Sequence, residues 1–176
     1  FYLGESFSQA ASYIANSSCP YVYAFSLDSS LLIKEEFNVD TDWMIAIAYY
    51  RGWLEKYKDS KKLKEIIDRV NGADVIIAPI ADNRMFDIIS SFVRGEITSA
   101  VTEKALSARD LGKQYVLRSE KAIKRLKFLR LGFVSSFEKD ELTKISYESL
   151  LKSQEDINKV KVSYKREGLY IEELLK

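Results

Sequence analysis

The chain has 176 residues, 47% hydrophobic and 30% charged, a composition typical of one globular domain with a sizeable core. Its 27 basic residues nearly balance 26 acidic ones, which argues against nucleic acid or a membrane surface as partner. One cysteine excludes an intrachain disulfide. The absence of histidine excludes, within this chain, a Ser-His-Asp triad, a Cys-His dyad and histidine metal sites.

No apolar run approaches the ~18 residues of a membrane-spanning helix, and no signal-peptide pattern is present. We therefore expect a cytoplasmic protein. The chain opens at Phe1, inside a segment with the character of a strand, so we expect residues upstream of it to be missing.

The N-terminal segment alternates strand and helix signals. A strand is expected to end near Gly4, and Ser6 and Gln9 have the spacing of a capping box that opens a helix over residues 7–14. After a turn cluster, residues 21–25 are aromatic and β-branched and predict a second strand.

The middle of the chain is mostly helical in pattern. Apolar spacing predicts helices over residues 41–54, 63–72, 83–95 and 97–109, with a buried strand over 74–80. Asp40 is expected to cap the first of these helices and Asp82 the third. Strands are expected again at 114–117 and 126–131, separated by one helical turn that opens at Ser119. This alternation indicates a mixed α+β core across residues 1–134.

Residues 135–176 are charge-dense and helix-favouring. Their apolar positions are sparse: Leu142, Ile145, Leu150, Ile157, Val160 and Tyr164. We expect a charged helical extension that packs by a narrow stripe on the core or on another protein, with Gly168 separating a short terminal segment.

Residues 1–13 (Phe-Tyr-Leu-Gly-Glu-Ser-Phe-Ser-Gln-Ala-Ala-Ser-Tyr) carry a resemblance to a known superfamily. The segment is similar to the nicotinamide-binding strand and helix of ADP-ribosyltransferases, in the branch of diphtheria-type toxins and poly(ADP-ribose) polymerases. The resemblance makes Tyr2 the tyrosine of the His-Tyr-Glu signature and Tyr13 the second ring of a nicotinamide sandwich. Two stacked rings suit a flat, electron-poor pyridinium. Ser8 is expected near the nicotinamide carboxamide.

A second motif lies late in the core. Residues 114–117 (Gln-Tyr-Val-Leu) followed by 119–122 resemble the motif that carries the catalytic carboxylate in this superfamily, with Gln114 at the carboxylate position. Residues 74–92 and the tail over 164–175 resemble an uncharacterised bacterial family of the same superfamily.

The resemblance implies a split β-sheet core that lacks its first strand, where the signature histidine would stand. It implies NAD as substrate, no metal, and transfer of one ADP-ribose to an acceptor that the sequence does not identify. A toxin-like role beside a small partner or antitoxin protein is also implied. The alternative is a degenerate module that keeps the fold and binds a nucleotide or a partner protein, because an amide at position 114 supplies no negative charge.

Simpler explanations stand beside these assignments. Tyr2 and Tyr13 are also compatible with core packing, and Glu120 is compatible with a helix-terminal acid as well as with an alternative catalytic carboxylate. Arg84 is a candidate anion contact, and Cys19 is expected to be structural. Six basic residues within 118–130 would suit the NAD pyrophosphate, a nucleic acid or an acidic partner, although a solvated face is the simpler interpretation.

Overall fold

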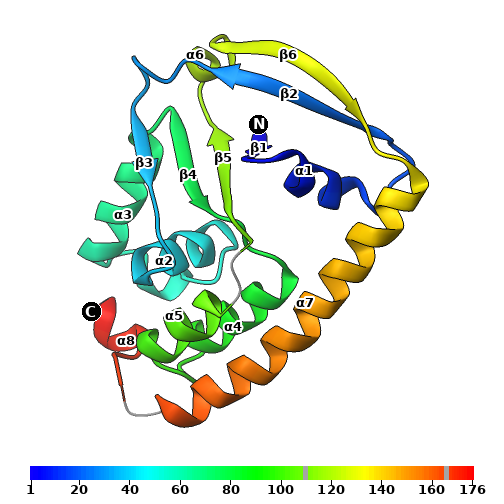
Figure 1. Cartoon of the computed structure of the whole chain (residues 1–176). Coiled ribbons are helices and arrows are strands. Elements are labelled where there is room, and N and C mark those ends of the chain that lie inside the picture. The colour runs from blue at the N-terminus through cyan, green and yellow to red at the C-terminus, as the bar shows by residue number, and fades with distance from the viewer. Residues whose placement is uncertain (109–110, 165–166) are drawn as a thin grey trace.

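The computed structural model describes the backbone of residues 1–108, 111–164 and 167–176 (Figure 1). It confirms the α+β class: helices surround a mixed four-stranded sheet and a separate two-stranded antiparallel sheet. The larger sheet has the order β1-β5-β4-β3, formed by β1 (Tyr2–Gly4), β5 (Lys113–Leu117), β4 (Val75–Pro79) and β3 (Lys34–Glu36). β3 pairs with β4 in parallel and the other neighbours are antiparallel.

The smaller sheet pairs β2 (Tyr21–Leu27) with β6 (Leu126–Phe133). Its register joins Tyr21 to Phe133 at one end and Leu27 to Leu126 at the other, with a bulge at the step from Ala24 to Phe25. In Figure 1 this sheet arches over β1 and the helix that follows it, α1 (Phe7–Ile14). A long-range pairing thus brings residues 99 to 112 positions apart to one edge of the molecule.

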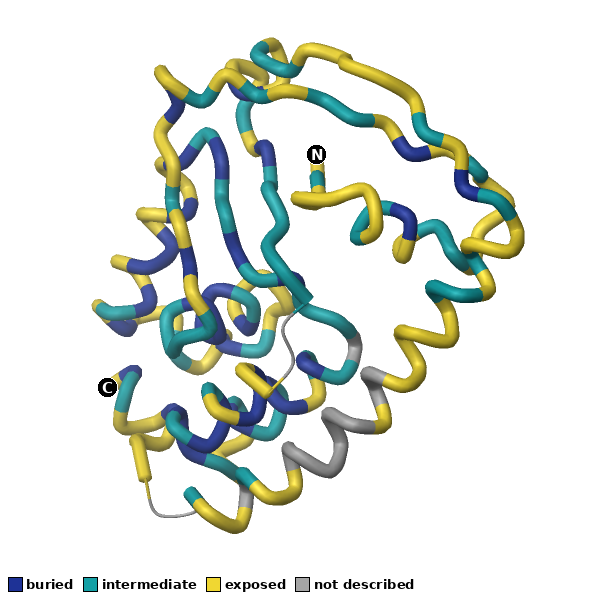
Figure 2. The backbone as a smooth tube through the Cα atoms, in the orientation of Figure 1, coloured by how far each residue is buried: buried dark blue, intermediate teal, exposed yellow. Residues whose placement is uncertain are grey.

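The main core lies between the four-stranded sheet and four helices: α2 (Thr41–Tyr50), α3 (Lys61–Gly72), α4 (Asn83–Val93) and α5 (Ser99–Ser107). Met44, Ile45, Ile89, Phe92 and Leu106 are among its fully buried members. Figure 2 shows the buried residues concentrated in this helical layer and its sheet, while exposed residues run along β6 and along the described part of the long helix α7 (Ser136–Ser163).

Several expected element ends need correction. The helix expected to reach Leu54 ends at Tyr50, because Gly52 takes a positive φ of 74° that breaks the helical path. Leu54 is nevertheless buried, just before a 3-10 helix, η1 (Glu55–Tyr57). The helix expected over 63–72 is α3: it ends at Gly72 as expected, begins two residues earlier at Lys61, and is followed by extended backbone at Ala73.

Capping predictions are confirmed. Ser6 and Gln9 form the complete capping box of α1, and Asp40 and Asp82 cap α2 and α4. Ser119 caps the short α6 (Glu120–Ile123). The helix expected over 97–109 is α5, and its expected last residue, Arg109, lies outside the described residues.

The C-terminal extension is α7 (Ser136–Ser163) followed by α8 (Ile171–Leu174). α7 packs against α1 near its start and against α5 near its end. Of the expected apolar stripe, Leu142 packs on the cluster under α1, Val160 packs on the main core and Ile145 is exposed. The side chains of Leu150 and Ile157 lie outside the described part.

The last residues of the chain belong to the main core. Ile171 and Leu175 are buried there, and the backbone amide of Ser99 donates to the carbonyl oxygen of Leu169 at 2.8 Å. The extension therefore packs on its own chain. Among the described helices, none has the length and hydropathy needed to cross a membrane.

Candidate functional site

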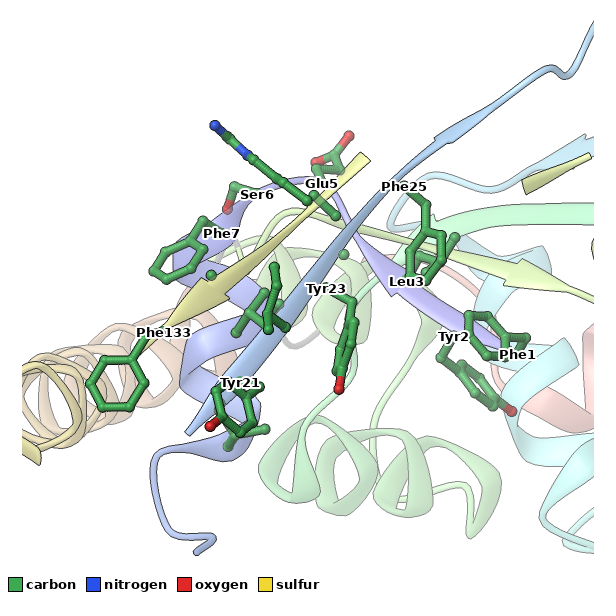
Figure 3. A pocket seen from close by; sticks show the side chains of 18 residues that line it. Phe1, Tyr2, Leu3, Glu5, Ser6, Phe7, Tyr21, Tyr23, Phe25 and Phe133 are labelled. Atoms are coloured by element: carbon green, nitrogen blue, oxygen red, sulfur yellow. The ribbon is translucent and has the colours of Figure 1, made fainter. Parts of the chain in front are cut away.

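A cleft of about 900 Å³ lies where the β2–β6 sheet passes over β1 and the start of α1 (Figure 3). Aromatic side chains from segments far apart in the sequence line it: Phe1, Tyr2, Phe7, Tyr21, Tyr23, Phe25 and Phe133. The volume is within the range of small-molecule sites, ~300–1,000 Å³. We therefore take this cleft as the candidate site.

The rings of the cleft are held by edge-on contacts with one another. Phe25 on β2 contacts Phe1 beside β1, with ring centroids 6.4 Å apart, and Phe128 on β6, at 5.9 Å. Tyr21 and Tyr23 alternate with buried or smaller residues along β2 and point the same way (Figure 3). The resulting wall of tilted rings can stack on a flat ligand.

Gln9 fixes α1 beside the start of β5. Its Oε1 accepts from the backbone amides of Glu5, at 2.6 Å, and Ser6, while its Nε2 donates to the carbonyl oxygen of Leu111 at 2.8 Å. A Cβ at Gly112 would lie 2.1 Å from Gln9 Nε2, and Gly112 has a positive φ of 76°. Glycine at this position therefore permits the close approach of the Gln9 amide. The sequence indicated the capping role of Gln9 but gave no sign of this second contact.

Phe7, the first residue of α1, packs against Gly132 of β6. A Cβ built on Gly132 would lie 2.5 Å from Cε2 of Phe7. The missing side chain lets the ring approach the strand, so this contact sets how closely α1 lies under the β2–β6 sheet.

Tyr2 and Gln114 lie on neighbouring strands. In the antiparallel β1–β5 pair, Tyr2 is opposite Val116 and Gly4 is opposite Gln114, so the side chains of Tyr2 and Gln114 share one face of the sheet. Tyr2 lines the cleft and is 74% exposed. Gln114 is half-buried, does not line the cleft, and donates from Nε2 to the carbonyl oxygen of Pro79 at 3.4 Å.

Ser8 and Tyr13 lie on α1 outside the lining of the cleft. Ser8 is in the first turn, with its Oγ 3.0 Å from the Oγ of Ser6. Tyr13 follows Gln9 by four positions, so the two share a side of the helix, and its ring is 68% exposed. The structure thus places Tyr2 in the cleft and puts the other three candidates on the elements that border it.

Sequence reasoning missed the contribution of the β2–β6 sheet to the cleft. The alternation Tyr21-Val22-Tyr23-Ala24-Phe25 was a visible signal of a strand with one aromatic face. Nothing local indicated that its partner would be β6, or that the pair would lie over α1.

Most basic residues of the 118–130 run are engaged in the structure. Arg118 donates to the carbonyl oxygen of Val70, and three ion pairs follow: Lys121 with Asp74 at 3.2 Å, Lys124 with Glu120 at 3.3 Å, and Arg125 with Asp28 at 2.6 Å. Glu120 is thereby a solvent-exposed partner of Lys124, away from the cleft. Within the described residues, Lys127 and Arg130 form no ion pair, and Arg130 lines the cleft.

Among the acidic residues that the structure describes, Asp74 has the largest pKa shift. Hydrogen bonds from the Ser119 hydroxyl and the Ile33 backbone amide, with Lys121 nearby, lower the pKa of Asp74 to about 2. These contacts join the segment before β3 and the start of α6 to β4, so the carboxylate has a structural role away from the cleft.

At the rim, the carboxylate of Glu5 accepts from the backbone amide of Lys113 at 3.0 Å. The ammonium of Lys113 pairs with Glu36, which raises the pKa of Lys113. Arg84 lies in the first turn of α4 and Cys19 is exposed before β2; neither lines the cleft. Within the described residues, no cluster of acidic and cysteine side chains could hold a metal ion.

Comparison with known proteins gives a family. Residues 1–128 match the model of a family described as a protein of unknown function, DUF3990. No curated protein and no solved structure matches the chain. The matched region includes β1, α1, β2, β5 and the first three residues of β6, and it covers well over half of the sequence. The chain belongs to the DUF3990 family.

Proposed function

We propose that this protein transfers ADP-ribose from NAD+ to an acceptor and releases nicotinamide. One observation carries the proposal: an aromatic cleft lies directly beside the β1–β5 pair, on which Tyr2 and Gln114 share a face. These are the residues that the resemblance to ADP-ribosyltransferases assigns to nicotinamide stacking and ribose positioning. Local sequence similarity and long-range geometry therefore support the same site.

The cleft suits the nicotinamide end of NAD+. The pyridinium ring is flat and positively charged, so it gains from the faces of aromatic side chains by stacking and cation–π attraction. Tyr2 presents an exposed ring at the cleft, and Tyr13 presents a second exposed ring on α1. In the proposal these two tyrosines bind the ring, and the Ser8 hydroxyl receives or donates a hydrogen bond to its carboxamide.

The transfer step breaks the bond between C1′ of the ribose and N1 of nicotinamide. The bonding electrons remain on the nicotinamide nitrogen, which becomes neutral, while a nucleophile of the acceptor forms the new bond to C1′ and loses its proton to solvent. Positive charge develops on the ribose in the transition state. Gln114 can orient a ribose hydroxyl through its amide oxygen, for which no hydrogen bond exists in the described structure. As a neutral group it provides less charge stabilisation than a carboxylate.

The second candidate function is a non-catalytic module that binds a nucleotide or partner protein in the same cleft. The neutral Gln114 and the absence of histidine from this chain favour it, because position 114 carries no carboxylate and the chain supplies no imidazole for the ribose. The two functions share a binding site and differ in whether the glycosidic bond is broken.

Nicotinamide release separates the two functions. The protein is incubated with NAD+, and free nicotinamide is followed by chromatography for the wild type and for Tyr2→Ala and Gln114→Ala. The matched control is Tyr147→Ala, which removes an exposed tyrosine of α7 outside the cleft. We expect release by the wild type and the control and a loss of at least tenfold in Tyr2→Ala and in Gln114→Ala.

Thermal unfolding of each variant tests whether a loss of nicotinamide release is due to misfolding. Release that is unchanged in Gln114→Ala would remove Gln114 from the mechanism. NAD+ binding by calorimetry without any nicotinamide release, with acceptor mixtures supplied, would favour the binding module over the enzyme.

A further inference from the structure

A second cleft, of about 620 Å³, lies on the face of the four-stranded sheet that points away from the main core. We propose that it binds a small amphipathic anion, a carboxylate with an apolar tail, whose charged end is held by Lys34. The inference goes beyond the proposed function, because Tyr2 and Gln114 lie on the opposite face of the same sheet. The second cleft adjoins the aromatic cleft at the end of β1, where both are lined by Leu3, Gly4, Glu5 and Phe25.

The strand registers place the floor of the second cleft on one face of the sheet. On β1 and β5, Leu3 is opposite Tyr115, which is itself opposite Ile77 of β4. In the parallel pair of β3 and β4, Lys34 is opposite Val75, two positions before Ile77. Side chains at paired positions point to the same face, and so do residues two apart on one strand. This face therefore carries a lysine on the edge strand β3 and apolar side chains on the other three strands.

The end of β2 forms the other wall of the second cleft. Phe25 and Leu27 of β2 line it, together with Ser29 just beyond the strand. Leu27 packs on the same apolar cluster as the floor, yet Leu27 and Phe25 are only half-buried, like Leu3 and Ile77. The cleft thus retains apolar surface that a ligand would remove from water, and its volume is within the range of small-molecule sites, ~300–1,000 Å³.

Lys34 supplies the unbalanced charge of the second cleft. The described lining has two charged side chains, Glu5 and Lys34. The carboxylate of Glu5 accepts from the backbone amide of Lys113, whose ammonium pairs with Glu36 and lies close enough to Glu5 to interact with its charge. Among the described residues, Lys34 has no ion-pair partner. The charge of this cleft therefore favours a ligand with a negative group at Lys34.

The arrangement of charge and apolar surface defines the class of ligand. The sheet order places β1 three strands away from β3, about 14 Å at the usual spacing of strands. A ligand with its carboxylate at Lys34 can extend a tail across β4 and β5 toward Leu3. The tail would bury apolar surface, whereas a carboxylate without a tail would gain one exposed ion pair, which is weak in water. Both parts of the ligand are therefore needed.

Octanoate, octan-1-ol and acetate test the proposal by calorimetry, because they separate the tail from the charge. We expect the wild type to bind octanoate at least tenfold more tightly than acetate. Lys34→Gln should weaken octanoate binding at least fivefold and leave octan-1-ol binding within twofold, whereas Lys34→Arg keeps the charge and should stay within threefold of the wild type. Lys127→Gln removes an exposed lysine outside both clefts and is the matched control.

Two further variants locate the ligand. Leu27→Ala shortens the β2 wall and should weaken octanoate and octan-1-ol alike, with thermal unfolding to check that the variant is folded. Tyr2→Ala alters the aromatic cleft on the other face and should leave octanoate affinity within twofold of the wild type. A loss of octanoate binding in Tyr2→Ala would place octanoate in the aromatic cleft and overturn the proposal.

The test is independent of the transferase proposal, since none of its readouts depends on nicotinamide release. Equal octanoate affinity in the wild type and Lys34→Gln would overturn the role of Lys34. Octanoate binding no tighter than that of acetate would show that the apolar floor takes no tail, and the absence of octanoate binding by the wild type would reject the site.

Discussion

The ring of Phe7 occupies the space that a side chain at position 132 would fill: a Cβ on Gly132 would lie 2.5 Å from Cε2 of Phe7. This contact joins the first turn of α1 to β6 across 125 positions of sequence, and both residues line the cleft. It makes the geometry of the cleft sensitive to a single methyl group.

Gly132→Ala should move the Phe7 ring more than it destabilises the fold. The atom that the new methyl meets is at the end of a half-exposed side chain, so the ring can turn aside at a cost of about 1 kcal/mol, the lower end of the range for overpacking. Denaturant unfolding measures the cost, with Gly72→Ala as control, since a Cβ there meets nothing within 4 Å. A loss above about 3 kcal/mol would mean that the strand itself shifts.

Gly168→Ala should be more damaging, because the obstacle is backbone. Gly168 has a positive φ of 82°, and a Cβ would lie 2.6 Å from the backbone nitrogen of Ala100, at the start of α5. The left-handed conformation alone costs a non-glycine residue about 1–2 kcal/mol, and the contact adds to it. We expect a loss of about 2 kcal/mol or more in the free energy of unfolding, and faster proteolysis of the C-terminal residues. Wild-type stability in this variant would contradict the docking of the tail.

Asp74 should make the free energy of unfolding depend on pH between about pH 4 and pH 2. Its folded pKa is lowered from 3.8 to about 2, so the stabilisation it provides is fully present above pH 3.8 and is lost as the pH falls through about 2. The free energy of unfolding of the wild type should therefore fall more steeply between pH 4 and pH 2 than that of Asp74→Asn. Ser119→Ala removes the strongest hydrogen bond to the carboxylate and should also flatten this slope. Parallel slopes in all three proteins would show that the carboxylate titrates normally.

Tyr13→Ala should weaken NAD+ binding without affecting the fold. The ring is mostly exposed and contributes little to the core, whereas a stacking contact with nicotinamide is worth about 0.5–1.5 kcal/mol, or roughly two- to tenfold in affinity. Calorimetry with NAD+ measures the change, and Tyr147→Ala serves again as the exposed control. Equal NAD+ affinity in Tyr13→Ala and the wild type would leave Tyr2 as the sole proposed stacking ring.

Local signals in the sequence predicted most elements because their causes are local. Ser6 and Gln9 formed the expected capping box, and Asp40, Asp82 and Ser119 capped the helices assigned to them. β3 was missed because Lys34–Glu36 is a three-residue strand of charged residues, with neither alternation nor an apolar run. β3 forms because β4 pairs with it in parallel, and this partner is set by the tertiary structure, not by the sequence of residues 34–36.

The candidate site also combines local and long-range features. Short motifs predicted Tyr2 and Gln114, and the β1–β5 register places the two on one face of the sheet. The aromatic wall that includes Tyr21 and Tyr23 could not be foreseen, since it depends on the pairing of β2 with a strand about a hundred positions away. The tail shows the same dependence: four helical residues preceded by a charged segment gave no sign that Ile171 would complete the main core.

α7 spans the molecule from the β2–β6 sheet to the helices of the core, and its 28 residues correspond to about 42 Å of helix. A helix behaves as a spacer of fixed length and fixed phase: each inserted residue would lengthen it by about 1.5 Å and rotate one end against the other by roughly 100°. The helix therefore fixes the distance and the relative rotation of the β2–β6 sheet at one end and the buried tail at the other. Insertions or deletions in α7 should therefore preserve the shape of the cleft only when they add or remove close to a whole number of turns. The number of residues in α7 then matters more for the cleft than their identities.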